Sequence, residues 1–170
     1  MKKKLYVASA MVWLVVLKAF GQTTDSAYAL MLKGMYNYSV PQLSPTELLG
    51  LLQRVKYKPL LLDTRSLQEY KVSHLSDSWF IAYDDFHVSQ LKDVPKDTPI
   101  ILYCSVGYRS ERIGEQLQQA GYHNVKNLYG GIFEWINQGY PVYNKKGKTN
   151  QIHAYSSTWG VWLQKGGESI

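Results

Sequence analysis

Residues 99–110 read Pro-Ile-Ile-Leu-Tyr-Cys-Ser-Val-Gly-Tyr-Arg-Ser, and Cys104 within them is the only cysteine of the 170-residue chain. A short apolar run ends at Cys104, four residues separate it from Arg109, and a helical pattern follows. This pattern predicts a buried strand that delivers a cysteine to a loop at the start of a helix. Loop amides and the positive end of the helix dipole stabilise negative charge there, which favours a reactive thiolate.

The single cysteine also limits the redox chemistry of the chain. Neither an intramolecular disulfide nor a Cys-x-x-Cys motif can form. Two interpretations of Cys104 remain, a buried and inert core residue or an exposed thiol that is used. Its position at a strand end, ahead of a loop that contains glycine, favours the second.

Short apolar segments alternate with helical patterns along most of the chain. Strands are expected at 60–62, 79–82, 99–103 and 125–128, and helices from 44 onward and at 67–71, 84–91, 109–119 and 132–137. This alternation predicts an α/β fold with a central, mostly parallel sheet and helices on both faces. Ligands of such sheets bind beyond the carboxyl ends of the strands, where Cys104 is expected.

The loop that follows Cys104 is suited to enclosing an anion. Gly107 lets the backbone take a positive φ at the tight part of the curve. Successive N–H groups can then point inwards as an anion nest, and Arg109 adds a fixed positive charge. The group that such a loop stabilises is a thiolate, or a thiolate that carries one extra atom.

Several motifs follow one another in a specific order around this loop. They are Leu-Leu-Asp-Thr-Arg at 61–65, Glu69-Tyr70, His74-Leu75, the loop at 104–110, Leu-Tyr-Gly-Gly-Ile-Phe-Glu-Trp at 128–135, and Gly-Tyr-Pro-Val at 139–142. Together they resemble a rhodanese-like domain, the fold of the sulfurtransferases, over residues 43–143. The departures affect one turn, where Ser73 replaces a frequent glycine and Ser76-Asp77-Ser78 replaces a frequent Pro-Gly-Ala.

The resemblance implies covalent catalysis at Cys104. Its thiolate would take the outer sulfur of a donor such as thiosulfate, and the resulting persulfide would pass that sulfur to cyanide or a thiol. The substrate-binding residues implied are those of the loop: Ser105, Val106, Gly107, Tyr108, Arg109 and Ser110. No metal or organic cofactor is implied. The Cys-x4-Arg spacing resembles the sulfurtransferases, whereas the related dual-specificity phosphatases have Cys-x5-Arg.

Four polar residues outside the loop are candidate supporting residues. Asp63 and Arg65 are interpreted as structural braces of the sheet end, with Glu69 as the expected partner of Arg65. Arg109 either binds an anionic donor or locks the loop by pairing with a carboxylate. His74 is interpreted as structural, because a thiolate that its loop already stabilises needs no general base.

Residues 1–21 have the pattern of a secretory signal peptide. Lys2–Lys4 form a positive start, Leu5–Leu17 form an apolar run, and Ala19-Phe20-Gly21 favours cleavage before Gln22. The run is too short to span a bilayer comfortably, and an uncleaved anchor is the alternative. The mature protein is therefore expected to be exported, either periplasmic or secreted, with no stable membrane span after cleavage.

The positive charge of the chain is largely a property of this leader. Lys2, Lys3, Lys4 and Lys18 lie within it, so its removal lowers the formal net charge from +6 to +2. Nucleic-acid binding needs a clustered basic face, and no nucleic-acid partner is expected.

Two flanking segments lie outside the resemblance. An amphipathic helix is expected over 26–37 in the N-terminal extension 22–42, with an apolar face formed by Ala27, Leu30, Met31 and Tyr36. In the C-terminal tail 144–170, a surface linker is expected over 144–150, and the apolar run 159–163 is expected to fold back on the domain. The alternative is that the flanks dock a partner protein. A persulfide carrier with little turnover and a catalytically silent interaction module therefore remain as alternative functions.

Overall fold

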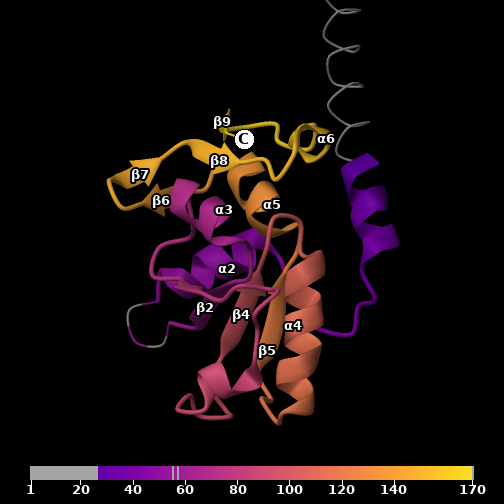
Figure 1. The fold of residues 1–170 in the computed structure, drawn as a ribbon, viewed down its shortest axis with the longest axis vertical. Coiled ribbons are helices and arrows are strands. Elements are labelled where there is room, and N and C mark those ends of the chain that lie inside the picture. Colours follow the sequence, from indigo (N-terminus) through magenta and orange to yellow (C-terminus); the bar gives the residue numbers. More distant parts are fainter. Residues whose placement is uncertain (1–26, 55, 57, 170) are drawn as a thin grey trace, which may run out of the picture. The chain divides into compact units, whose positions relative to one another are not determined.

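The core of the protein is a five-stranded parallel sheet. The computed structural model describes residues 27–54, 56 and 58–169, so the predicted signal peptide lies outside the described residues. Across the sheet the strands are β1 (Gln42–Leu43), β5 (Val125–Leu128), β4 (Ile100–Tyr103), β2 (Leu60–Asp63) and β3 (Trp79–Phe80) (Figure 1). Each neighbouring pair is parallel, and the predicted α/β fold with a central parallel sheet is confirmed.

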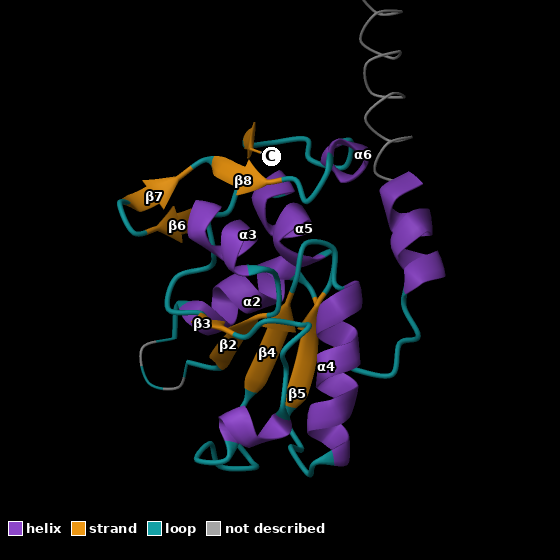
Figure 2. Cartoon of the chain, in the orientation of Figure 1, coloured by secondary structure: helices purple, strands orange, loops and turns teal. Residues whose placement is uncertain are grey.

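Helices surround the sheet, as Figure 2 shows. They are α2 (Pro45–Leu52), α3 (Leu67–Val72), α4 (Tyr108–Gln119) and α5 (Gly131–Asn137), with a 3₁₀ helix, η1 (Val88–Leu91). The helix expected over 84–91 is thus limited to its last four residues, because the chain turns before them and buries Phe86 in the core. No helix in the described ranges has the length and apolarity that a membrane crossing requires.

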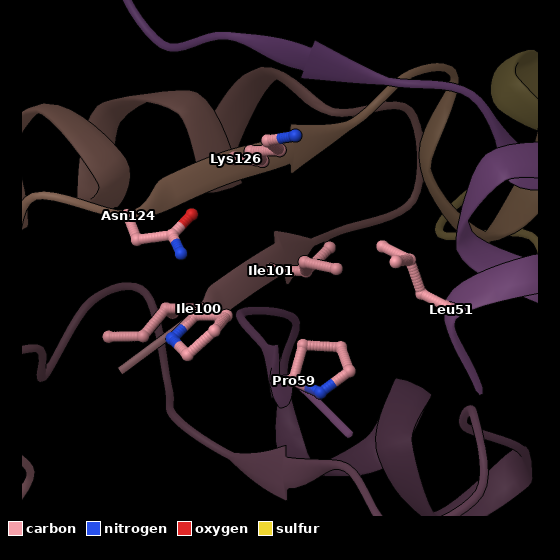
Figure 3. Close-up of a pocket in the computed structure, with 7 residues that line it drawn as sticks. Leu51, Pro59, Ile100, Ile101, Asn124 and Lys126 are labelled. Atoms are coloured by element: carbon pink, nitrogen blue, oxygen red, sulfur yellow. The ribbon is translucent and has the colours of Figure 1, made fainter. Parts of the chain in front are cut away.

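The central strand β4 is covered on both faces. All four of its residues are buried, as expected for a parallel strand between two layers. Ile100 and Leu102 belong to the same buried cluster as Ile113 of α4. Ile101 points the other way, toward Leu51 of α2 (Figure 3). The strand therefore runs through the core and ends where Cys104 begins the next loop.

The local sequence explains how the helices begin. Ser44 and Glu47 form a capping box at α2, and Ser66 and Glu69 form the same box at α3. By contrast, the N-cap of α4 is Gly107, whose φ is +98°. This glycine turns the chain from the strand end directly into the helix, which places the N-terminus of α4 beside Cys104.

The chain divides into two compact units, residues 1–35 and 36–170. A helix over 27–35 belongs to the first unit. Its buried positions are Tyr28 and Leu32, one turn apart, whereas Leu30 is 71% exposed. The predicted apolar face is therefore wrong, and Tyr36 lies beyond the helix, in the second unit.

The C-terminal segment has its own small strands. An antiparallel hairpin of β6 (Val142–Asn144) and β7 (Gly147–Thr149) occupies the region predicted as a linker. It is followed by β8 (Gln151–His153), α6 (Ser157–Gly160) and β9 (Gly167–Ser169), with β8 and β9 paired in parallel. Asn137 of α5 donates to the carbonyl of Trp162 at 2.8 Å, and its Oδ1 accepts from the N–H of Gln164 at 2.8 Å. These bonds fasten the segment to α5.

Candidate active site

Cys104 follows the carboxyl end of β4 and lies at the N-terminus of α4. Its Sγ accepts a hydrogen bond from the N–H of Gly107 at 3.1 Å. The residue is only 1% exposed, so the thiol is buried beneath its own loop and not exposed as the sequence suggested. Burial does not make it an ordinary core residue, because a backbone donor is directed at its sulfur.

The carbonyl groups of the loop are all turned outward. Each of four consecutive carbonyls accepts a hydrogen bond from outside the loop: Cys104 O from Ile132 N at 2.9 Å, Ser105 O from Phe133 N at 3.0 Å, Val106 O from the Tyr36 hydroxyl, and Gly107 O from Asn127 Nδ2 at 2.9 Å. A trans peptide directs its N–H opposite to its C=O. The N–H groups of residues 105–108 therefore point away from these outer partners, and that of Gly107 donates to Sγ.

Arg109 is held by a buried carboxylate. Its two terminal nitrogens donate to Glu69 at 2.9 and 3.2 Å, and Nη2 also lies 3.1 Å from the hydroxyl oxygen of Ser105. That hydroxyl in turn donates to Glu69 at 2.7 Å. Of the two roles predicted for Arg109, the structure thus shows a pairing that locks the loop.

The charges of this pair stabilise one another. Although burial alone would raise it, the pKa of Glu69 is lowered to about 2 because Arg109, the Ser66 N–H and the Ser105 hydroxyl all favour the carboxylate. Burial likewise opposes the charge of Arg109, yet its interactions with Cys104 and with the carboxylate of Glu69 raise its pKa. The guanidinium is therefore a permanent cation shared between the loop and α3.

Arg65 does not pair with Glu69, so that prediction is wrong. Arg65 is fully buried and binds Asp63 at 2.7 and 2.9 Å, and it also donates to the carbonyl of Ser73 at 2.5 Å. The four-residue spacing from Arg65 to Glu69 is misleading, because Ser66 is the N-cap of α3 and Arg65 precedes the helix. Asp63 and Arg65 instead join the end of β2 to the end of α3.

His74 lies beside α3. Its ring stacks on Tyr70 with centroids 4.0 Å apart, and Nδ1 lies 2.9 Å from the Tyr70 carbonyl oxygen. Its backbone bridges to Tyr143 of β6. These contacts hold the imidazole ring against α3 and join its backbone to β6. A hollow of about 270 Å³ lies there, lined by Tyr70, Lys71, His74 and Lys145.

Sequence reasoning missed three residues that act on the loop. Asn127 holds the Gly107 carbonyl and accepts from the Ser110 hydroxyl at 2.7 Å. A polar residue inside a buried strand was a usable signal for it. Tyr36, which the sequence placed on the apolar face of a helix, and Tyr155 gave no signal of contact with the loop, because they lie in the two flanking segments. The Tyr155 ring lies 5.2 Å from the Arg109 guanidinium.

Another hollow, of about 200 Å³, lies at the amino ends of the strands, opposite the end that carries Cys104 (Figure 3). It is lined by Leu51, Pro59, Pro99, Ile100, Ile101, Asn124 and Lys126. These residues gather at the amino ends of β2 and β4, whereas Cys104 follows a carboxyl end. Its lining is mainly apolar and offers no nucleophile, so the loop at Cys104 is the candidate active site.

An α/β domain whose sole cysteine lies in an amide-lined loop at a strand end defines a recognisable class. A family model for the rhodanese-like domain matches residues 44–138, which is more than half of the chain. The chain therefore belongs to the rhodanese-like domain family.

Relatives with assigned activities cover this domain. A sulfurtransferase of Allochromatium vinosum is 32% identical over 88 residues, which cover 52% of this chain and 81% of that protein. An adenylyltransferase and sulfurtransferase of Ogataea parapolymorpha is also 32% identical over 88 residues, covering 50% of this chain and 23% of that protein. A tRNA uridine(34) hydroxylase of Protochlamydia amoebophila is 33% identical over 111 residues, which cover 61% of this chain and 34% of that protein. The chain thus spans only a minor part of the last two relatives.

Solved structures share the fold. A rhodanese-related protein of Thermoplasma volcanium superposes with a TM-score of 0.53 and 26% identity, covering 60% of this chain and 96% of that one. A thiosulfate sulfurtransferase of Pseudomonas aeruginosa superposes with a TM-score of 0.56 and 22% identity. The superposition covers 62% of this chain and 20% of that one. At that identity the second likeness bears on the fold alone.

Proposed function

We propose that the protein is a sulfurtransferase that carries sulfane sulfur on Cys104 as a persulfide. The observation that supports this most is the orientation of the loop, whose carbonyls of residues 104–107 are bound from outside and whose Gly107 N–H donates to Sγ. A persulfide adds one negatively charged sulfur within reach of these loop amides. Preorganised amides stabilise such a charge as an oxyanion hole stabilises oxygen.

With thiosulfate as the donor, the first step is a displacement at sulfur. The Cys104 thiolate attacks the outer sulfur, a new S–S bond forms, and the S–S bond of thiosulfate breaks as sulfite leaves with the electron pair. In the second step cyanide or a thiolate attacks the terminal sulfur of the persulfide. The Cys104 thiolate is regenerated, and thiocyanate or a new persulfide is released.

The pairing of Arg109 bears on the choice of donor. Because Glu69 neutralises this guanidinium, the site presents little net positive charge to a dianion such as thiosulfate. A donor of lower charge, such as an organic persulfide, would lose less affinity from that pairing. We therefore expect the persulfide of a small uncharged thiol such as 2-mercaptoethanol, which carries at most one negative charge, to be used with a lower KM than thiosulfate.

Removal of the nucleophile tests the proposed function. The wild-type protein incubated with thiosulfate and cyanide is expected to produce thiocyanate, measured as its ferric complex, and Cys104→Ser is expected to produce none. Ser76→Ala, in an exposed turn, is the matched control and should keep full activity. Thiocyanate formation that persists in the Cys104 variant would refute the assignment.

A persulfide carrier is the second candidate, favoured by the burial of Cys104 to 1% exposure. Mass spectrometry of the protein after exposure to a donor separates the two. A stable gain of one sulfur with negligible turnover would identify a carrier, to which a partner protein could dock through the flanking segments. Rapid loss of the added sulfur to cyanide or a small thiol would identify an enzyme.

We also propose that the protein is exported and cleaved before Gln22. The tripartite pattern of residues 1–21 supports this. Expression of the full chain in a bacterial host, followed by fractionation and intact-mass measurement, tests it. A periplasmic product that starts at Gln22 is expected, and a cytoplasmic product that retains the leader would contradict the proposal.

A further inference from the structure

A chain of hydrogen bonds ends on the sulfur of Cys104. The N–H of Gly130 donates to the Tyr36 hydroxyl oxygen at 2.9 Å, and that hydroxyl donates to the carbonyl of Val106. The peptide group that contains this carbonyl also contains the N–H of Gly107, which donates to Sγ at 3.1 Å. One tyrosine hydroxyl thus acts on the peptide group that binds the sulfur.

A hydrogen bond to a peptide carbonyl changes the opposite end of the same peptide. It draws electron density toward the oxygen, which makes the N–H a stronger donor, and consecutive bonds reinforce one another in a low dielectric. It also fixes the plane of the peptide, so the N–H keeps its direction toward Sγ. Both effects favour negative charge on the sulfur.

Tyr36 is fitted closely to this peptide. It is 6% exposed, and a Cβ added to Gly107 would overlap its hydroxyl oxygen. Burial raises the pKa of Tyr36, so its hydroxyl keeps its proton and remains a donor. The ring packs edge-on against Tyr38 and Tyr129, with centroids 5.7 and 5.9 Å away. The side chain is therefore held in place by two ring contacts and by the two hydrogen bonds of its hydroxyl.

The segment that carries Tyr36 is anchored to α4. The backbone N–H groups of Asn37 and Ser39 donate to the buried carboxylate of Glu111 at 3.0 and 3.1 Å. Val40 is fully buried against Gly114, where a Cβ would come within 2.9 Å of it. Residues 36–40 precede the family match at 44–138, so this brace lies outside the matched region.

We propose that Tyr36 is a positioning residue of the sulfur-transfer site, which orients and polarises the Val106–Gly107 peptide toward Cys104. The effect of Tyr36 on the rate of sulfur transfer rests on the proposed function. Its effect on the thiol itself is independent of any sulfur donor, because alkylation of Cys104 needs only the thiolate. In this role Tyr36 acts through the peptide alone, without contact to donor or acceptor.

The pH profile of Cys104 alkylation by iodoacetamide tests the proposal. Tyr36→Phe keeps the ring and removes the hydroxyl, so we expect its profile to shift to higher pH. At neutral pH the alkylation rate is expected to fall roughly threefold to tenfold, the range of one ordinary hydrogen bond. In thiocyanate formation kcat is expected to fall while KM stays close to the wild-type value.

Tyr122→Phe is the matched control. Tyr122 is also buried and donates to a backbone carbonyl, that of Leu91, but it belongs to the core cluster. Both variants are expected to lose stability in thermal unfolding, and only the Tyr36 variant is expected to shift the pH profile. A profile of Tyr36→Phe that coincides with the wild type would overturn the proposal.

Restoring a donor on the same ring distinguishes positioning from packing. Incorporation of 4-aminophenylalanine at position 36 supplies an N–H group where the hydroxyl stood, and it is expected to return the profile toward wild type. If circular dichroism shows that this protein is folded and its alkylation profile does not return toward wild type, the role of the hydrogen bond is contradicted. If Tyr36→Phe alters alkylation while neither protein transfers sulfur, the proposed function fails and the positioning role stands.

Discussion

Glu69 performs two tasks with one carboxylate. It closes the capping box of α3 by accepting from the N–H of Ser66 at 3.0 Å, and it binds Arg109 and Ser105 of the loop. The Ser-x-x-Glu pattern is enough to predict the first task. The second depends on the parallel pairing of β2 with β4, which brings the start of α3 to the same sheet edge as the loop.

Replacement of Glu69 by Gln tests what the charge of this carboxylate contributes to the stability of the protein and to its choice of sulfur donor. The Ser66 and Ser105 bonds can persist, but Arg109 loses its counter-charge. We expect a loss of about 3 kcal/mol in the free energy of unfolding, the upper end of the scale for hydrogen bonds to charged groups. The freed guanidinium is expected to lower the KM for thiosulfate, measured by thiocyanate formation.

Glu47→Gln is the matched control, because Glu47 fills the same capping position in α2 at the surface. Its KM for thiosulfate is expected to stay at the wild-type value. A Glu69 variant with an unchanged or higher KM would show that Arg109 does not face the donor.

At the scale of elements, two helix N-termini meet at the loop. The N-terminus of α4 presents the Gly107 N–H to sulfur, and the first amides of α5 hold the carbonyls of Cys104 and Ser105. Gly131, the first residue of α5, has a φ of +57°, and a Cβ there would overlap both carbonyl oxygens. The approach of α5 to the loop therefore requires glycine.

Gly131→Ala is expected to displace the loop from α5. The left-handed backbone alone costs an alanine about 1 kcal/mol, and overlap with two backbone oxygens adds to that. Gly121→Ala is the matched control, since Gly121 has a φ of +88° and nothing within 4 Å of a Cβ. In urea unfolding the Gly131 variant should lose more stability than the control, and only it should lose kcat. Equal losses in both would mean that the loop tolerates the overlap.

At the scale of the whole molecule, segments from both flanks of the family domain reach the loop. Tyr36 comes from before the matched region, and Tyr155, beside Arg109, comes from after it. Tyr155 has a φ of +67°, and its N–H donates to Nδ1 of His153 at 2.9 Å. Two side chains around the loop thus come from outside the region that the family model matches.

The acid stability of the molecule is expected to depend on Glu69. Its pKa falls from 4.5 to about 2 on folding, so its contribution is present above pH 4.5 and is lost as the pH falls toward 2. The shift corresponds to about 3 kcal/mol. Urea unfolding between pH 2 and 7 measures the free energy of unfolding of the wild type and of Glu69→Gln. The difference between the two should shrink as the pH falls toward 2. A constant difference between them across that range would contradict the lowered pKa.

The sequence by itself determined the α/β class with a parallel sheet, four of its five strands, among them the one that leads to Cys104, and the turn at Gly107. Each of these depends on neighbours in the chain: a four-residue apolar strand, a glycine that can take positive φ, and a helical pattern that follows directly. Hydrophobic periodicity and backbone preferences act over a few residues, so they can be read locally.

Only the tertiary structure decided which side chains serve the loop. Tyr36 binds a carbonyl 70 residues away, and Glu69 binds an arginine 40 residues away. Local patterns carry no information about such pairs, because they depend on strand order and on how closely α5 and the flanking segments approach the sheet edge. The identity of the reactive atom therefore followed from the sequence, while the groups that hold and polarise its loop followed from the packing.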